Sequence, residues 1–198
     1  MRKYTIRALT LGLAAGVLLG LFQTGRGPQL ADKLIRLHVV AASDSPEDQA
    51  DKLAVRDSVL AAAAPMLAQA GSVTEARQAL ETGLPAFRAA AEETLRSRGV
   101  SAPVTVSLEQ TRFPAKDYET FSLPAGQYEA LRVVIGPGEG HNWWCVVYPQ
   151  LCLCATTREV ETAAAAAGFT PAEISAITSP GGVVFRWRIL ELWRAWFG

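Results

Sequence analysis

Apolar and polar positions alternate with different periods along the chain, and these periods predict where strands and helices lie. An uncharged apolar run covers residues 8–22, and an Ile- and Val-rich run at 34–42 is typical of a buried strand. Between residues 103 and 148 the period becomes two, and strand formers concentrate at 128–135 and 143–148. We predict an antiparallel meander over this second region.

Helix signals lie between and after these strand patterns. Ser45 before Pro46 is typical of a helix start, and Ser72 with Glu75 has the spacing of a capping box. We expect Pro65 to kink or end the first helix, and Gly83-Leu84-Pro85 to interrupt the second. Further helices are expected from residue 156 onward, where an alanine run stops at Gly168 and a second cap signal begins at Thr170. The order of elements favours an α+β fold, a meander sheet packed by helices.

The beginning of the chain has the layout of a targeting segment. Its basic residues, Arg2, Lys3 and Arg7, precede the apolar run at 8–22. This run of 15 residues is about 22 Å long as a helix, whereas the hydrocarbon layer is about 30 Å thick. We therefore expect residues 1–31 to be a signal peptide with a linker, or an uncleaved membrane anchor, and residues 32–198 to form one domain.

The composition of the chain argues against binding of nucleic acids and of nucleotide phosphates. The 198 residues include 19 Lys and Arg against 19 Asp and Glu, so the chain has no net basic field to attract nucleic acid. The glycines at 136, 138 and 140 lack the Lys-Ser/Thr ending of a phosphate loop and are typical of a turn between strands. We expect neither a nucleic-acid partner nor a cofactor.

Arg56 is a charged residue on the apolar face of the first predicted helix. A charge in that position needs a partner, and Asp44 and Asp57 are the candidates. We interpret the three as a structural ion-pair group, with direct contact to a receptor as the alternative.

The cysteines and histidines permit two kinds of chemistry. Cys145 with His38 is a candidate thiol-hydrolase pair, whereas His141 lies about 13 Å from Cys145 along a straight strand. The spacing of Cys145, Cys152 and Cys154 lacks a C-x2-4-C knuckle, so we expect no metal site. A Cys145–Cys152 disulfide across a bend at residue 149 suits an exported protein, and buried free thiols are the alternative.

Two aromatic regions are candidates for contact with a partner. Trp143 and Trp144 are consecutive in a predicted strand, so they point to opposite faces, and we expect one of them to be exposed beside Asn142 as a protein-binding hot spot. Residues 185–196 combine arginines with tryptophans along a helical stripe, which favours either packing on the sheet or contact with a membrane surface.

Two stretches resemble a known family. Residues 35–60, IRLHVVAASDSPEDQADKLAVRDSVL, are similar to the N-terminal signature of stage II sporulation protein R. Residues 121–152 contain the distinctive GHNWWC string and resemble the same family. The resemblance implies a protein that is made in the forespore and exported into the space between forespore and mother cell, secreted or tethered to a membrane.

The resemblance also implies a role for the exported chain. A protein of this family is expected to activate a membrane-embedded aspartic protease, which then processes the pro-form of the mother-cell sigma factor, sigma-E. On this interpretation the chain is an intercellular signal and not an enzyme. The alternative, a cell-envelope hydrolase using Cys145 and His38, needs those two side chains to meet.

Overall fold

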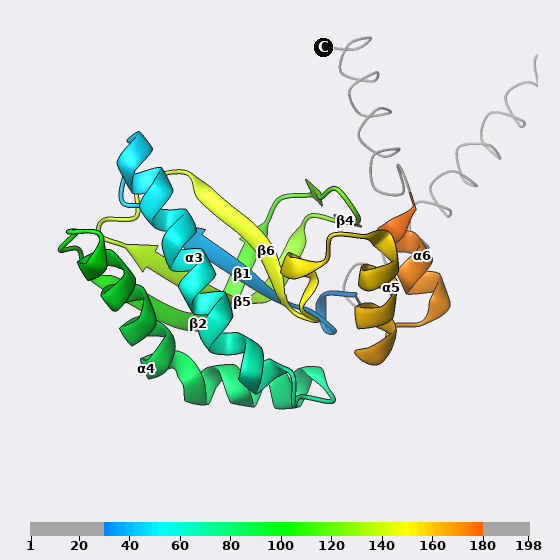
Figure 1. Ribbon diagram of the computed structural model, residues 1–198. Coiled ribbons are helices and arrows are strands. Elements are labelled where there is room, and N and C mark those ends of the chain that lie inside the picture. The colour runs from blue at the N-terminus through cyan, green and yellow to red at the C-terminus, as the bar shows by residue number, and fades with distance from the viewer. Residues whose placement is uncertain (1–29, 180–198) are drawn as a thin grey trace, which may run out of the picture.

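The computed structural model describes residues 30–179, except for the side chain of Leu153, and has an α+β fold, which confirms the predicted class. Two long helices cover one face of a four-stranded sheet, and two short helices lie at its end (Figure 1). The elements follow in the order β1 (Ile35–Val40), α3 (Pro46–Leu67), α4 (Val73–Ser97), β2 (Val104–Phe113), β3 (Lys116–Asp117), β4 (Ser122–Leu123), β5 (Gly126–Ile135), β6 (Asn142–Tyr148), η1 (Leu151–Leu153), α5 (Thr157–Ala166) and α6 (Pro171–Thr178).

The sheet is mixed, so the expected meander is wrong in its connectivity. The strand order is β2-β5-β1-β6, with β1 parallel to β5 and antiparallel to β6. All six residues of β1 are buried, as is typical of a strand with neighbours on both sides and cover on both faces. The chain therefore crosses the end of β1 between β5 and β6 instead of pairing these two strands directly.

The two long helices begin where the local signals predict, but they continue past the expected breaks. The side chains of Ser45 and Ser72 accept hydrogen bonds from the backbones of Asp48 and Glu75, which confirms both caps. The capping box predicted at Ser72 is incomplete, because the Glu75 carboxylate accepts from the backbone N–H of Gly71 (2.8 Å) instead of that of Ser72. Helix α3 continues two residues past Pro65, and α4 is unbroken although Gly83-Leu84-Pro85 was expected to interrupt it.

Packing explains why α4 is continuous. Gly83 is buried where α4 meets α3, so close to the Phe87 ring and to Met66 that a Cβ atom would lie within 3.0 Å of them. Pro85 is exposed, and the helix therefore loses one backbone hydrogen bond without a clash against its neighbour. Tertiary burial thus outweighs the local breaker signal.

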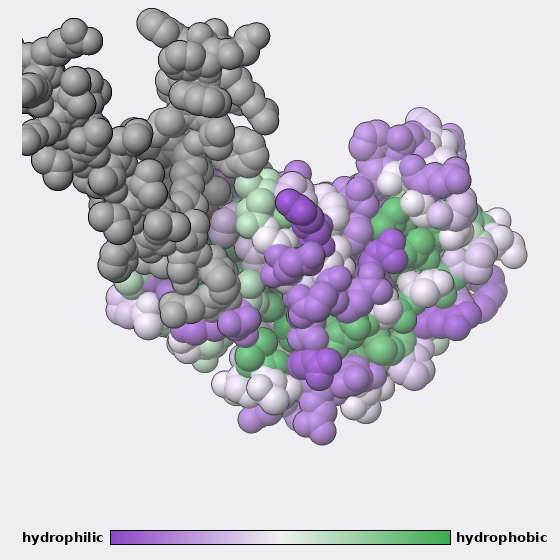
Figure 2. Space-filling model, turned by 180° about the vertical axis from the view of Figure 1, so that it is seen from behind, coloured by the Kyte–Doolittle hydropathy of each residue, from purple (hydrophilic) through white to green (hydrophobic). Residues whose placement is uncertain are grey.

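The core has two parts, one on each face of the sheet. The larger part lies between α3, α4 and the sheet, and its members include Leu37, Val55, Leu80 and Val133. The smaller part lies on the other face, where β4, α5 and α6 pack around Phe113, Tyr128 and Val146. Figure 2 shows that apolar patches alternate with polar side chains on the face turned away from α3 and α4.

Two predicted segments lie outside the described residues. These are the targeting segment, apart from its last two residues, and the C-terminal aromatic helix. Within residues 30–179, no helix combines the length and the apolar character needed to cross a membrane.

Candidate interaction site

Two loops meet above the end of β1, and they bring Asp44 and the start of β6 together. The loop after β1 and the glycine loop before β6 are joined by backbone hydrogen bonds, from Gly140 N to Ala41 O (3.0 Å) and from Glu139 N to Ala42 O (3.2 Å). A Cβ atom on Gly140 would lie 2.2 Å from the backbone oxygen of Ser43. Only glycine fits this approach, which explains one of the glycines in the predicted turn.

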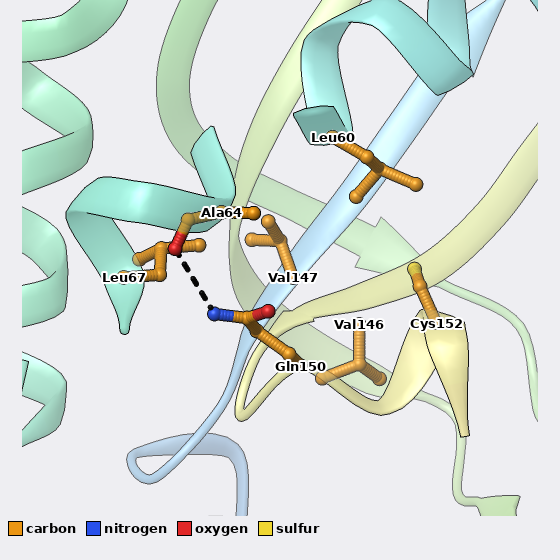
Figure 3. Close-up of a pocket in the computed structure, with 7 residues that line it drawn as sticks. All are labelled: Leu60, Ala64, Leu67, Val146, Val147, Gln150 and Cys152. Atoms are coloured by element: carbon orange, nitrogen blue, oxygen red, sulfur yellow. Dashed lines mark hydrogen bonds between the residues drawn. The ribbon is translucent and has the colours of Figure 1, made fainter. Parts of the chain in front are cut away.

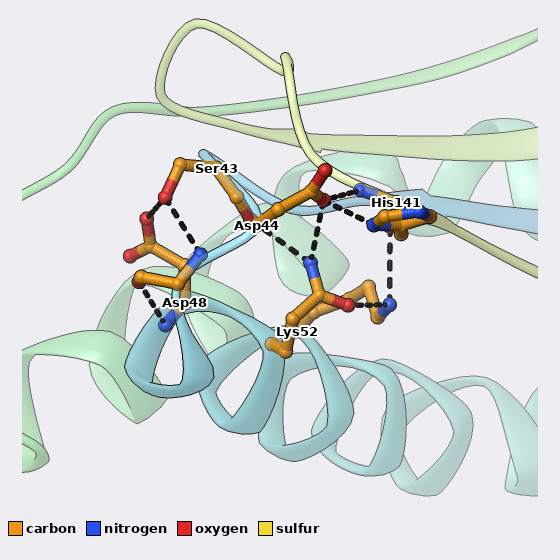
Figure 4. Close-up of polar contacts among 7 residues, drawn as sticks. Ser43, Asp44, Asp48, Lys52 and His141 are labelled. Carbon is orange, nitrogen blue, oxygen red and sulfur yellow. Dashed lines mark hydrogen bonds and ion pairs between the residues drawn. The ribbon is translucent and has the colours of Figure 1, made fainter.

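Polar side chains fix this junction (Figure 4). The Asp44 carboxylate accepts a hydrogen bond from the backbone N–H of His141 (2.6 Å) and contacts the Nδ1 atom of the same histidine. Lys52 is buried and donates to the backbone oxygen of His141 (3.0 Å) and to the side-chain oxygen of Gln49 (2.6 Å). Burial lowers the pKa of Lys52. The start of α3 and the start of β6 are therefore held together by side-chain contacts.

Arg56 has a partner, but it is only one of the two expected candidates. Its Nη2 atom lies 2.7 Å from the Asp57 carboxylate, whereas Asp44 pairs with His141. The Arg56 guanidinium carbon also lies 4.3 Å from the centre of the Trp143 ring. Because Arg56 remains 19% exposed and Asp57 63% exposed, the pair lies at the surface and not in the core.

The two tryptophans point to opposite faces, and neither is fully exposed or fully buried. Trp143 lies on the α3 face against Arg56. Trp144 lies on the other face, stacked on the His38 ring with the ring centres 3.9 Å apart. The side-chain oxygen of the exposed residue Asn142 accepts a hydrogen bond from His38 Nε2 (2.6 Å). Instead of one exposed and one buried tryptophan, each face of the sheet therefore carries one half-buried tryptophan.

Arg36 is a fully buried cation that no local sequence pattern predicts. Its Nε donates to the backbone oxygen of Cys145 (2.8 Å), and its Nη2 donates to the Tyr118 hydroxyl (2.7 Å). Its guanidinium carbon lies 4.2 Å from the centre of the Phe113 ring and 5.0 Å from that of Tyr128. Within the described part of the chain, no carboxylate lies within ion-pair distance, and burial lowers the pKa of Arg36.

Cys145 and His38 do not form a catalytic pair. Cys145 lies opposite Leu37 in the ladder, and His38 lies opposite Trp144, so the two side chains project from opposite faces of the sheet. The Cys145 sulfur is bonded to Cys152, with the two Cα atoms 5.7 Å apart, and Cys154 is free. The geometry therefore contradicts the alternative of a thiol hydrolase built on this pair. Among residues 30–179, no group of three or more metal-binding side chains lies together.

Removal of the disulfide is expected to destabilise the domain moderately. The bond joins residues seven positions apart. By restricting the unfolded chain, a crosslink over so short a loop raises the free energy of unfolding by about 2 to 3 kcal/mol. A protein with Cys145→Ala and Cys152→Ala should lose that amount in urea unfolding, whereas Cys154→Ala should lose less than about 1 kcal/mol. Equal losses in both proteins would show that the bond does not constrain the fold.

The stability of the domain is expected to depend on pH through His38. Burial lowers the pKa of His38 from its ordinary value of 6.5, and the hydrogen bond with Asn142 only partly opposes this effect. Between the two pKa values the unfolded chain binds a proton that the folded chain does not, so this contribution to stability is present above pH 6.5 and decreases as the pH falls below it. The free energy of unfolding should therefore fall less steeply below pH 6.5 in His38→Gln than in the wild type. Parallel curves would contradict the assignment.

The segments that build this site lie within a region that matches a known protein family. The family model for stage II sporulation protein R matches residues 31–158, which include β1, α3 and the whole glycine loop through β6. The chain belongs to the stage II sporulation protein R family. It therefore has a role in sporulation.

One curated member of the family is similar over much of the same region. Stage II sporulation protein R of Bacillus subtilis (strain 168) is 38% identical over 123 residues, which are 62% of this chain and 55% of that protein. The matched region thus spans little more than half the length of the relative. No solved structure matches the chain.

Proposed function

We propose that the chain is an exported intercellular signal of sporulation. On this proposal it crosses the forespore membrane and activates a membrane-embedded aspartic protease, which then processes the pro-form of sigma-E. Activation requires only that the signal bind the active state of its receptor more tightly than the inactive state. The chain itself performs no chemistry in this scheme.

The observation that carries the proposal is the arrangement of the GHNWWC segment. This segment lies at an accessible end of the sheet, and its histidine, asparagine and tryptophans are engaged in hydrogen bonds and ring contacts. Its cysteine is bonded to Cys152 and so supplies no thiol nucleophile. Such a site suits recognition of a partner better than catalysis.

The disulfide also supports export. Disulfides persist in oxidising compartments outside the cytosol and are rare inside it. The Cys145–Cys152 bond links β6 to η1 within the matched family region. A domain with this bond is suited to the space outside the forespore membrane.

The test is protease-dependent processing in cells that co-produce the membrane protease and the sigma-factor precursor. Three strains are compared: one exports this protein, one retains it because residues 1–31 are deleted, and one lacks it. The precursor should be processed only in the first strain. An intact precursor despite a secreted, folded protein would overturn the proposed role, and processing in the second strain would overturn the need for export.

A further inference from the structure

A groove runs between α3 and the edge strand β6, and its properties indicate what it binds. We call it the α3–β6 groove, and its main lining residues are Arg56, Leu60, Ala64, Trp143, Val147 and Cys152. It consists of two adjoining hollows that share Leu60 and Cys152, and the larger one has a volume of about 270 Å³. Figure 3 shows the smaller hollow, where Gln150 reaches from the end of β6 to the backbone oxygen of Ala64 (3.4 Å). Gln150 therefore bridges α3 and the end of β6 at one end of the groove, and Arg56 lies at the other end.

One wall of the groove is a strand edge. β6 is the last strand in the order β2-β5-β1-β6, so one side of its backbone has no neighbouring strand within residues 30–179. Side chains already bind two of its carbonyls, since Tyr118 donates to Trp144 O and Arg36 to Cys145 O. The first residues of β6 are the part of this edge that lies at the Arg56 end of the groove. Unpaired strand edges bind extended peptides by adding a strand.

The polar groups that line the larger hollow have more donors than acceptors. The Asp57 carboxylate already accepts bonds from the Nε and Nη2 atoms of Arg56. The indole nitrogen of Trp143 is buried and has no hydrogen-bond partner among the described residues. An occupant that supplies an oxygen acceptor would therefore pair with the N–H groups of Arg56 that Asp57 does not take, beside the Trp143 ring.

The apolar surface of the groove extends onto the outside of α3. Leu53 is the one large apolar side chain that is exposed among the described residues, with 37% of its surface accessible. It precedes Arg56 and Leu60 by three and seven positions, so the three residues form one stripe along the helix. Apolar surface is thus available to a partner on both sides of the Arg56–Trp143 pair, from Leu53 on one side and from Leu60 on the other.

We propose that the α3–β6 groove binds an extended segment of the protein that this signal activates. The segment adds to the free edge of β6, places an aliphatic side chain in the hollow beside Leu60 and the disulfide, and directs a carbonyl or carboxylate oxygen toward Trp143 and Arg56. This inference rests on the proposed function and specifies its contact surface. A second copy of the chain and a lipid surface are the competing occupants.

The first test changes the groove without changing the outer surface of α3. Leu60→Arg places a long charged side chain in the hollow, whereas Ala61→Arg makes the same charge change at the adjacent exposed position. Both proteins are exported as full chains in the processing assay. At equal secreted amounts, processing should fall at least tenfold with Leu60→Arg and less than twofold with Ala61→Arg. Full activity of Leu60→Arg would overturn the proposal.

The second test does not depend on whether Leu60→Arg folds. A photoreactive benzoylphenylalanine replaces the exposed rim residue Asp57 in one protein and the exposed Arg112, on the opposite edge strand β2, in another. Crosslinking to the membrane protease from position 57 but not from 112 is expected. Equal crosslinking from both positions, or crosslinking to a second copy or to lipid alone, would overturn the assigned occupant. If the wild-type protein itself fails to trigger processing, the proposed function fails, and this occupant fails with it.

Discussion

Arg36→Ala is expected to lose about 3 to 5 kcal/mol of the free energy of unfolding. The Arg36 side chain is fully buried on the face of the sheet away from α3 and α4. Truncation leaves a cavity beside Phe113 and Tyr128, and it removes the donors that bind Cys145 O and the Tyr118 hydroxyl. Urea unfolding monitored by tryptophan fluorescence measures the loss.

Arg36→Met separates packing from charge. Methionine fills most of the volume between the rings and has no charge to desolvate, and replacement of a buried charge by an apolar side chain of similar volume is often nearly neutral. The Tyr118 hydroxyl keeps a partner in this variant, because it also donates to Trp144 O (3.2 Å). We therefore expect Arg36→Met to lose less than half as much as Arg36→Ala. Equal losses would show that the hydrogen bonds and charge of Arg36, and not its volume, stabilise this core.

The sequence alone did not identify Arg36, and the reason is physical. Its partners come from β2, from β5 and from the segment around Tyr118, which lies 82 positions away along the chain. Arg56, in contrast, is recognisable from the sequence, because its apolar neighbours lie within one turn of the same helix. Helical periodicity reveals such local neighbours, but an aromatic box assembled from distant strands leaves no pattern within a single segment.

Local signals predicted the elements better than their arrangement. The caps at Ser45, Ser72 and Thr170 form, because a serine or threonine side chain satisfies backbone donors within its own helix. Alternation likewise located β2, and enrichment in strand-forming residues located β5 and β6. The insertion of β1 between β5 and β6 was not predicted, because it depends on which strand is buried most deeply and not on the order of strands along the chain.

The candidate site shows the same division between local and distant contacts. Asp57 is next to Arg56 in the sequence and pairs with it, whereas Asp44 pairs with a histidine 97 positions away. That histidine is brought to Asp44 by the crossing of the glycine loop over β1. Contacts of this kind follow from the strand order, so they could not be assigned before the topology was known.

Gly140→Ala is expected to disrupt the junction of the two loops above β1. The new Cβ atom would lie 2.2 Å from Ser43 O, 2.5 Å from the adjoining carbonyl carbon and 2.9 Å from the Ala41 side chain. Backbone atoms have to move apart, so the hydrogen bond from Gly140 N to Ala41 O weakens, and the domain should lose about 2 to 3 kcal/mol. Because the same loops carry Asp44 and His141, the start of β6 shifts relative to α3, and precursor processing should fall as well.

Gly71→Ala is the matched control for this change. Gly71 is exposed, and a Cβ atom there would meet only the carboxylate end of Glu75, at 3.5 Å. Its stability should stay within about 0.5 kcal/mol of the wild type, since it requires no movement of the backbone. If Gly140→Ala matched this control in urea unfolding and in processing, the two loops would separate without cost. That result would show that the close contact between the glycine loop and the β1–α3 loop does not fix the position of β6 relative to α3.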